Sequence, residues 1–172
     1  NGYVLSSESC AFDAIKAEFI RHIDPGEMVI IDDSGVRSTI YAEPEKIDKK
    51  LCVFEYIYFA RGDSHIDGQS VYQSRLNMGR ELYNETKYDA DIVMSIPDSG
   101  TTAALGYARA SGIPFAEGLV KNRYSGRTFI KPNQEERELA VRMKLNALPH
   151  IVGGKRIVLI DDSIDRKSTR LN

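Results

Sequence analysis

Cysteine is scarce in this sequence, with only Cys10 and Cys52 among its 172 residues. Two cysteines cannot supply the disulfide framework of a small secreted domain, so the sequence favours a reducing compartment. No apolar run approaches the roughly 18 residues that a membrane span needs. Residues 1–5 also lack the basic region and apolar core of a signal peptide. We therefore expect a cytoplasmic protein with no membrane partner.

An excess of either charge is missing as well. The 23 Lys and Arg residues are balanced by 25 Asp and Glu residues, which gives a formal net charge of −2. A chain so close to neutral has no overall field to attract nucleic acid, so no nucleic-acid partner is expected. Its content of 42% hydrophobic and 28% charged residues is that of a globular protein and excludes disorder, collagen and coiled coil.

The pattern of the chain changes near residue 50. The first part is β-rich, with a polar connector at 42–50. From residue 51 onward the pattern changes, and strands that alternate with helices predict an α/β fold with a parallel sheet from about residue 70. The expected elements of the first part are a short helix at 10–15 and strands at 17–23, 28–31 and 36–41, with a hairpin turn at 32–35. Those of the second part are strands at 52–60, 92–96, 115–120 and 156–160, helices at 71–87, 101–110 and 136–148, and a long loop at 121–135.

Two adjacent carboxylates, Asp161 and Asp162, follow the apolar strand 157–160 directly. Open α/β sheets bind ligands at the carboxyl ends of their strands. A pair of carboxylates at that edge can bind sugar hydroxyls, or hold a metal ion directly or through water. The alternative is a solvated acidic loop. A phosphorylated receiver domain is disfavoured, because its acidic pair would follow the first strand of the sheet rather than the last.

Small residues follow another buried strand and open the next helix, in the segment 96–102 (IPDSGTT). Such residues leave backbone N–H groups exposed, and a helix N-terminus attracts an anion such as pyrophosphate. An ordinary helix cap by Asp98 or Ser99 is the alternative. Because this loop and the acidic pair follow two strands of one predicted sheet, each strengthens the case for the other.

A third segment, 121–130 (KNRYSGRTFI), contains three cations, an aromatic residue and a glycine. A loop of this composition can close over a polyphosphate and exclude water. The alternatives are a solvated basic loop and a nucleic-acid contact, and the net charge of the chain disfavours the latter.

Five segments, taken in this order, resemble the amidophosphoribosyltransferases. They are FEYIYFAR at 54–61, PDS at 97–99, KNRYSGRTFI at 121–130, VRMKL at 141–145 and DDSI at 161–164. The resemblance covers residues 2–164. This family of glycosyltransferases starts purine synthesis by converting phosphoribosyl pyrophosphate (PRPP), glutamine and water into 5-phosphoribosylamine, glutamate and pyrophosphate.

The resemblance implies a particular division of the α/β fold. Residues 1–50 are similar to the end of an N-terminal-nucleophile (αββα) glutaminase domain. Residues 51–172 are similar to the first part of a type I phosphoribosyltransferase domain, which is built on a parallel sheet and is truncated here. The resemblance further implies PRPP and glutamine as substrates, purine nucleotides as inhibitors, and a homo-oligomer.

Site residues follow from the resemblance position by position. It implies that Mg²⁺ is associated with Ser99, Asp161 and Asp162. The implied PRPP contacts are Asp98, Ser99, Gly100, Thr101, Asp161, Asp162 and Ser163. Lys121, Tyr124, Arg127, Thr128 and Ile130 match a flexible loop that closes over PRPP and forms the ammonia channel, and the first three of them match catalytic positions. Cys52 matches a ligand of the [4Fe–4S] cluster of some members, with a buried thiol at the start of a strand as the alternative, whereas Cys10 is expected to be a buried structural residue.

Two departures from the family change what is expected of this chain. It begins with Asn1 rather than the family's nucleophilic cysteine, so glutamine hydrolysis by the chain alone is not expected. The family continues after the acidic pair with a glycine that lets the backbone approach the 5′-phosphate of PRPP, and this chain has Lys167 there, with Asp165 nearby. We therefore expect an incomplete, inactive fragment whose last residues, 165–172, come from a frameshift, a sequence junction or a truncated reading frame.

Two other functions remain open at this point. One is a non-catalytic domain of the same fold that senses PRPP or a nucleotide. The other is a type I phosphoribosyltransferase that acts on a nucleobase, although the β-rich residues 1–50 and the loop 121–130 argue against it. Fold alone cannot choose among these functions, because one fold hosts many.

Overall fold

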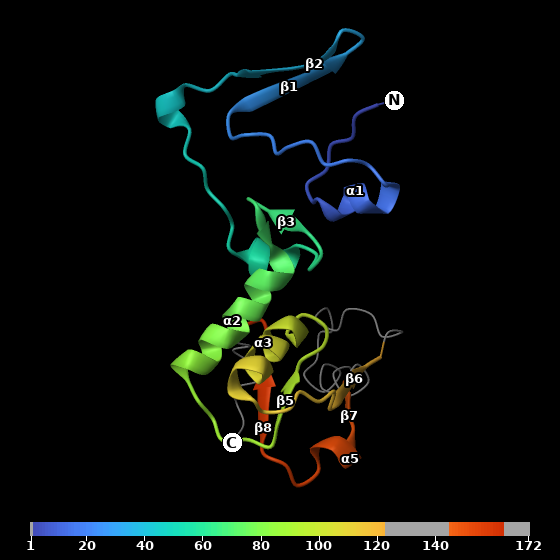
Figure 1. Ribbon diagram of the computed structural model, residues 1–172, viewed down its shortest axis with the longest axis vertical. Helices are drawn as coiled ribbons and strands as arrows, with labels where there is room; N and C mark the ends of the chain where they lie inside the picture. The colour runs from blue at the N-terminus through green and yellow to red at the C-terminus, as the bar shows by residue number, and fades with distance from the viewer. Residues whose placement is uncertain (1, 123–144, 164–172) are drawn as a thin grey trace, which may run out of the picture. The chain divides into compact units, whose positions relative to one another are not determined.

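The computed structural model describes residues 2–122 and 145–163 (Figure 1). The chain forms two compact units, Asn1–Tyr72 and Gln73–Asn172. Residues 51–72 pack with the first unit, and the expected family domain boundary near residue 50 stays a prediction. No helix in the described ranges is long and apolar enough to cross a membrane.

The first unit contains a short helix and a β-hairpin. Its elements are α1 (Cys10–Ile15), β1 (Glu27–Asp32), β2 (Gly35–Ile40), a 3₁₀ helix (Pro44–Lys46), a π-helix (Glu55–Phe59), β3 (His65–Ile66) and β4 (Gln69–Ser70). β1 pairs with β2 in antiparallel register from Glu27–Ile40 to Asp32–Gly35. The turn between them is stabilised by the Asp32 carboxylate, which accepts a hydrogen bond from the Ser34 N–H at 2.9 Å. The predicted short helix, the hairpin and its turn are confirmed.

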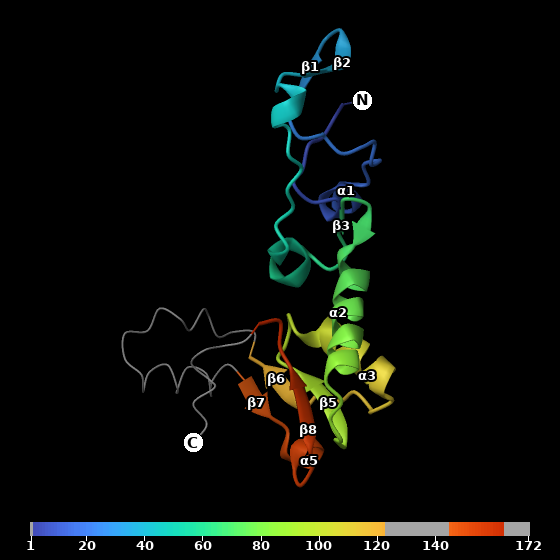
Figure 2. The same ribbon diagram turned by 90° about the vertical axis from the view of Figure 1, so that its left-hand side faces the viewer.

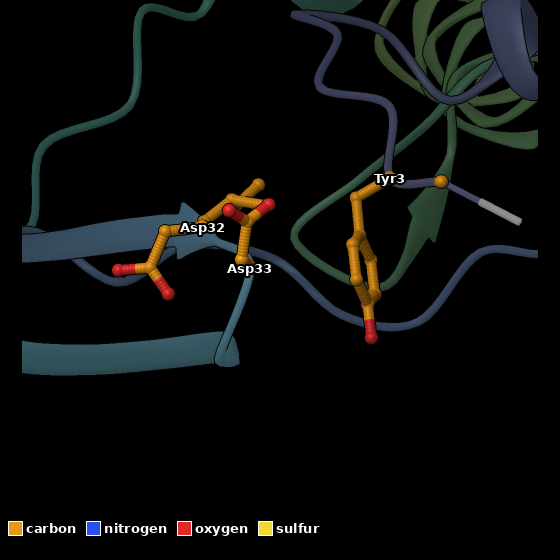
Figure 3. A pocket seen from close by; sticks show the side chains of 5 residues that line it. Tyr3, Asp32 and Asp33 are labelled. Carbon is orange, nitrogen blue, oxygen red and sulfur yellow. The ribbon is translucent and has the colours of Figure 1, made fainter.

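An open pocket lies beside this hairpin turn (Figure 3). It is lined by Gly2, Tyr3, Ile31, Asp32 and Asp33. These residues belong to the first unit, and none of them is a residue to which the sequence analysis assigned ligand binding.

Two predicted strands, 17–23 and 52–60, both fall within the first unit of the structure, and both predictions are wrong. Residues 17–23 form no strand, and Phe19, Ile20 and Ile23 are exposed. Their alternating pattern lacks a described strand to pair with, and a strand needs such a partner for its backbone groups. Residues 52–60 contain the π-helix instead of a strand.

One aromatic residue of the π-helix, Tyr56, is buried, whereas Tyr58 and Phe59 are exposed. Tyr56 and Ala60 form a small core with Val71, and Ile66 packs against it. The Tyr56 hydroxyl donates a hydrogen bond to the Ile66 carbonyl at 2.7 Å. An apolar run of this length does not by itself distinguish a strand from a buried helix, which explains the wrong prediction.

The second unit is built around two parallel strands. β5 (Ile92–Ser95) pairs with β8 (Ile157–Ile160) in the register Ile92–Ile157 to Ser95–Ile160, and both ribbon views show the two strands side by side (Figure 2). Phe115 forms a further parallel bridge with Val93. The predicted parallel sheet and its strands 92–96 and 156–160 are therefore confirmed. The predicted strand 115–120 is confirmed only at its end, as β6 (Leu119–Lys121).

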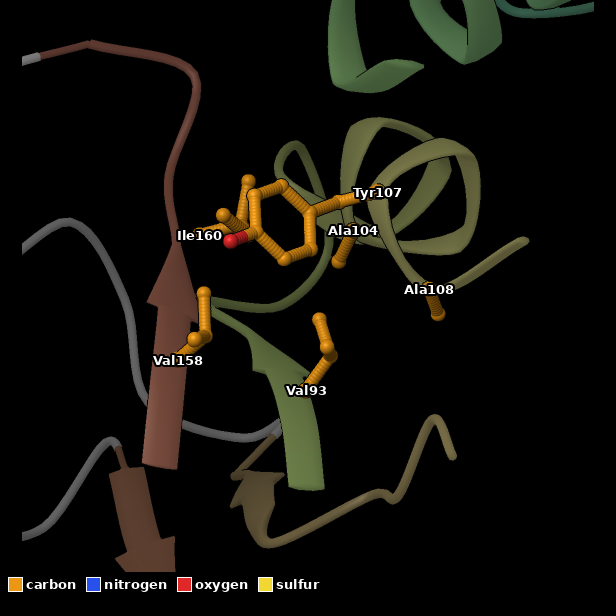
Figure 4. Packing of buried hydrophobic residues seen from close by; sticks show 6 residues of the cluster. All are labelled: Val93, Ala104, Tyr107, Ala108, Val158 and Ile160. Atoms are coloured by element: carbon orange, nitrogen blue, oxygen red, sulfur yellow. The ribbon is translucent and has the colours of Figure 1, made fainter. Parts of the chain in front are cut away.

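Helix α3 (Thr101–Ser111) covers this sheet, as Figure 4 shows. Its C-terminus is closed by Gly112, whose φ of +74° is the left-handed conformation that glycine adopts at helix ends. The core between helix and sheet consists of Val93, Ala104, Tyr107, Ala108, Val158 and Ile160. The predicted helices at 71–87 and 101–110 are confirmed as α2 (Val71–Glu85) and α3.

Glycines bring the backbones of α2 and α3 into contact. A Cβ atom at Gly106 would lie 2.0 Å from the carbonyl oxygen of Leu76. A Cβ atom at Gly79 would lie 1.8 Å from the carbonyl oxygen of Ala103. Real side chains never approach backbone so closely, so this helix pair depends on both glycines.

The remaining described elements are β7 (Leu145–Ala147) and the short helix α5 (Pro149–Val152). β7 pairs with β6 in antiparallel register. The predicted helix 136–148 is therefore wrong over Leu145–Ala147, and its residues 136–144 lie outside the described ranges. The predicted loop 121–135 also lies outside them from residue 123 onward.

Candidate functional site

The candidate site lies where β5 and β8 end. Because the two strands are parallel neighbours, the segments that follow them leave the same edge of the sheet. The pairing continues one residue beyond β5, since the Ile96 N–H donates to the Ile160 carbonyl at 2.9 Å. Chain segments 97–101 and 161–163 therefore start side by side.

Gly100 allows these two segments to approach each other closely. A Cβ atom at this position would lie 2.6 Å from the carbonyl oxygen of Ile160 and 3.1 Å from the Cα of Asp161. Its backbone is right-handed, with φ −74° and ψ −10°, so glycine is needed here for space rather than for conformation. Gly100 thus places the loop before α3 directly against the acidic pair.

Backbone hydrogen bonds within the segment 96–101 determine the conformation of the loop before α3. The Gly100 N–H donates to the Ile96 carbonyl at 3.2 Å, and the Thr101 N–H donates to the Asp98 carbonyl at 3.3 Å. A hydrogen bond of 3.1 Å between the hydroxyls of Ser95 and Thr101 ties the start of the helix to the end of β5. Gly100 occupies the N-cap position, and no side chain caps the helix. The alternative that Asp98 or Ser99 serves as an ordinary helix cap is therefore wrong.

The acidic pair is ordered by local hydrogen bonds. Asp161 is exposed, and its Oδ1 accepts the N–H of Asp162 at 2.8 Å. Asp162 is half-buried, and its Oδ1 accepts the hydroxyl of Ser163 at 2.7 Å. Both hydrogen bonds are local to this segment, and the close approach of Gly100 to Asp161 sets the acidic pair beside the loop 97–101.

Lys121 joins this site from β6. Its Nζ lies 2.6 Å from Oδ2 of Asp98, although the two residues are 23 positions apart. The structure thus brings a cation from the third predicted segment to the loop of the second. The other residues assigned to that segment, Tyr124, Arg127, Thr128 and Ile130, lie outside the described ranges.

The described part of the site fits Mg²⁺ by its donor chemistry. The carboxylates of Asp161 and Asp162 and the hydroxyl of Ser99 are hard oxygen donors, which Mg²⁺ prefers. Among residues 2–122 and 145–163, no group of three or more His, Cys, Asp or Glu residues gathers to form a complete protein cage. Such a donor set suits the usual mode of Mg²⁺ binding, in which one or two carboxylates act together with ligand phosphates and water.

The two cysteines of this chain cannot by themselves hold an iron–sulfur cluster. A [4Fe–4S] cluster needs four thiolates, and the chain has two cysteines. Cys10 is buried, as expected, whereas Cys52 is exposed and precedes the π-helix rather than starting a strand. The alternative that Cys52 is a buried thiol is therefore wrong, and its role as a cluster ligand stays a prediction.

No family model matches the chain. Among curated proteins, it is 53% identical to the amidophosphoribosyltransferase of Synechocystis sp., 53% to that of Archaeoglobus fulgidus and 54% to that of Drosophila melanogaster. These similarities extend over 97–98% of the chain but only 31–36% of the relatives, so the chain spans about a third of their length.

Solved structures point to the same relatives. The chain superposes with a TM-score of 0.83 and 51% identity on the Bacillus subtilis glutamine PRPP amidotransferase complexed with ADP and GMP. A structure described as the allosteric regulatory enzyme of purine biosynthesis gives a TM-score of 0.84 at 51% identity. Each similarity covers 95% of this chain and 35% of the solved chain. The chain is therefore homologous, over nearly its whole length, to about one third of an enzyme of the amidophosphoribosyltransferase family.

Proposed function

We propose that this chain is part of a glutamine-dependent amidophosphoribosyltransferase and forms two sides of its PRPP site. The observation that carries the proposal is the close approach of Gly100 to Ile160 and Asp161. It sets a loop suited to pyrophosphate beside a carboxylate pair suited to ribose hydroxyls. These are the chemical groups at the two ends of the bond that breaks when PRPP reacts.

The charge of each group determines the role that we propose for it. The backbone N–H groups at the start of α3 face an anion favourably, so the loop 97–101 binds the pyrophosphate group. Asp161 and Asp162 accept hydrogen bonds from the ribose hydroxyls. Lys121 places a positive charge near the leaving pyrophosphate. Ser99 and the two carboxylates are the residues that would hold Mg²⁺, which would neutralise charge on the pyrophosphate.

The reaction needs no nucleophilic side chain in this half of the enzyme. Ammonia forms a bond to the anomeric carbon of the ribose while the bond to pyrophosphate breaks. Positive charge develops on the ribose ring in this step, and carboxylates fixed nearby stabilise it. Tyr124 and Arg127 belong to the same proposal as residues of the closing segment, with support from the family resemblance alone.

Other properties of the relatives extend the proposal. The Bacillus subtilis enzyme was solved in complex with ADP and GMP, which supports purine nucleotides as inhibitors of the enzyme that carries this segment. A cytoplasmic location, a homo-oligomeric assembly and glutamine as the ammonia donor complete the proposal. They rest on the similarity to the family over the whole chain.

The test is a double substitution, Asp161→Asn with Asp162→Asn, in the amidophosphoribosyltransferase that carries this segment. We expect formation of phosphoribosylamine from PRPP to fall by about 10²-fold or more, because charge stabilisation is lost at the reacting centre. Glutamine hydrolysis, which belongs to the other domain, should persist. The matched control is Glu85→Gln with Glu117→Gln, which removes two exposed carboxylates of the same unit. Unchanged transfer in the Asp161/Asp162 variant would contradict the proposal.

A further inference from the structure

The carboxylate of Asp98 is unexpected in a loop that binds an anion. It adds negative charge beside the start of α3, where a pyrophosphate group is proposed to lie. Its side chain is 79% exposed, so it is not held there by burial. Its carboxylate instead meets Lys121, with Oδ2 at 2.6 Å from Nζ.

Lys121 is held at this place by its own strand. It is the last residue of β6 and pairs with Leu145 of β7, and its side chain is only 34% exposed. The position of the ammonium group is therefore set by a paired backbone and by its contact with Asp98. No other described residue forms an ion pair with Lys121.

An ion pair of this exposure is easily exchanged. Water screens both charges, and exposed pairs contribute little to stability. A polyphosphate carries several negative charges and binds cations more strongly than one carboxylate does, especially where Mg²⁺ shares the site. Asp98 thus holds the Lys121 ammonium group in place, but weakly enough for a phosphate group of a ligand to replace the carboxylate.

We propose that Asp98 is a positioning residue whose carboxylate stands in for a phosphate group at Lys121 while the site is empty. When a polyphosphate binds, Lys121 passes from the Asp98 carboxylate to a phosphate oxygen, and when pyrophosphate leaves it passes back. Asp98 therefore weakens binding of the anion and speeds release of pyrophosphate. This inference rests on the proposed function, since it takes the ligand to be PRPP or pyrophosphate.

Two other roles of Asp98 give different results. If its carboxylate were a direct ligand of Mg²⁺ or PRPP, its removal would weaken binding. If it only repelled the anion through space, its removal would tighten binding whether or not Lys121 was present. The proposed exchange predicts instead that removal of the Asp98 carboxylate tightens anion binding only when Lys121 is present.

A double-mutant cycle separates these roles. The dissociation constant of pyrophosphate with Mg²⁺ is measured by titration calorimetry in the amidophosphoribosyltransferase that carries this segment. The variants are Asp98→Asn, Lys121→Met and the double variant, with Glu117→Gln as a control for one exposed carboxylate. Asp98→Ser repeats the test with a smaller side chain, and far-UV circular dichroism confirms that each variant is folded.

We expect Asp98→Asn to tighten binding about fivefold when Lys121 is present, the ratio that corresponds to loss of one exposed ion pair. The same change should alter binding less than about twofold in the Lys121→Met background. The dissociation rate of pyrophosphate, followed by stopped flow, should fall with Asp98→Asn. Weaker binding after Asp98→Asn, or an equal gain in both backgrounds, would overturn the exchange.

The outcomes also distinguish this inference from the proposed function. If the unsubstituted enzyme does not bind PRPP with Mg²⁺, both are wrong. In a second case, the enzyme binds PRPP and loses this binding with Asp161→Asn and Asp162→Asn, but the effects of the Asp98 and Lys121 substitutions on pyrophosphate binding are additive. Only the exchange is then wrong.

Discussion

The hydroxyl of Ser64 donates a hydrogen bond to the carboxylate of Glu8 at 2.9 Å, across 56 positions of the chain. Ser64 is fully buried. The same carboxylate oxygen accepts the Arg61 N–H at 2.8 Å, and this contact above all holds the pKa of Glu8 below its ordinary value, although burial opposes it. Beside it, the Ser9 hydroxyl accepts the His65 N–H at 2.8 Å. Residues just before α1 are thereby fastened to the loop that leads to α2.

Replacing Glu8 by alanine should destabilise the first unit by about 1–3 kcal/mol, because the buried Ser64 hydroxyl loses its acceptor. Glu8→Gln should cost less, since its amide oxygen can still accept a hydrogen bond. The measurement is urea unfolding followed by circular dichroism, with amide hydrogen exchange of residues 61–65 to locate the change. Glu18→Ala at an exposed position is the control. Equal effects of the Glu8 and Glu18 substitutions would contradict this role.

Gly106→Ala should destabilise the second unit, although alanine in a helix interior is ordinarily more stable than glycine by about 1 kcal/mol. The sign reverses because the new Cβ would lie 2.0 Å from the Leu76 carbonyl and force α2 and α3 apart. Gly2→Ala is the matched control, since a Cβ atom there meets nothing within 4 Å. The midpoint of thermal unfolding should fall for Gly106→Ala alone. A rise would show that the two helices do not pack in this way.

Much of the second unit could be predicted because its signals are local. The apolar runs of β5 and β8 are short and bounded, and the alanine-rich pattern of α3 ends at Gly112, which adopts the left-handed cap. The rule that parallel strands share one edge then places Asp161 beside the loop 97–101. That placement needs no distance information, and the close approach of Gly100 agrees with it.

The features that the sequence did not predict correctly, or did not predict at all, include contacts between residues far apart in the chain. The predicted strand 52–60 contains the π-helix Glu55–Phe59, in which Tyr56 contacts Ile66 and Val71, and an apolar run cannot reveal such contacts. The pairing of Lys121 with Asp98 joins residues 23 positions apart, and opposite charges alone do not indicate which residues pair. The sequence marked both residues as site candidates, but only the structure shows that they meet.

The stability of the first unit should decrease in acid through Glu27. Two hydrogen bonds from Arg21, at 2.6 and 2.8 Å, together with the Asp24 N–H, lower the pKa of Glu27 from 4.5 to about 2. A depressed carboxyl pKa contributes stability above pH 4.5, and this contribution disappears as the pH falls towards 2. We expect the unfolding free energies of the native chain and Glu27→Gln to differ most near neutral pH and to converge between pH 4.5 and 2.

The control for this pH series is Glu45→Gln, which removes one carboxylate from an exposed position of the same unit. Urea titrations at several pH values, followed by circular dichroism, give the required free energies. A difference between the native chain and Glu27→Gln that grows as the pH falls would contradict the assignment, because the sign of the linkage would then be reversed.

Gly100→Ala should separate the two halves of the candidate site. The new Cβ would lie 2.6 Å from the Ile160 carbonyl oxygen, so the loop 97–101 must move away from the acidic pair. Because a displacement of about 1 Å can cost on the order of 10²-fold in catalysis, we expect a loss of PRPP turnover of that size. Gly112→Ala makes the same chemical change at the other end of α3, where φ is +74° and the space is open. It should lower stability by strain and leave turnover intact, so turnover and thermal unfolding measured together separate damage to the site from damage to the fold. Equal turnover in the two variants would show that contact between the loop and the acidic pair is not required.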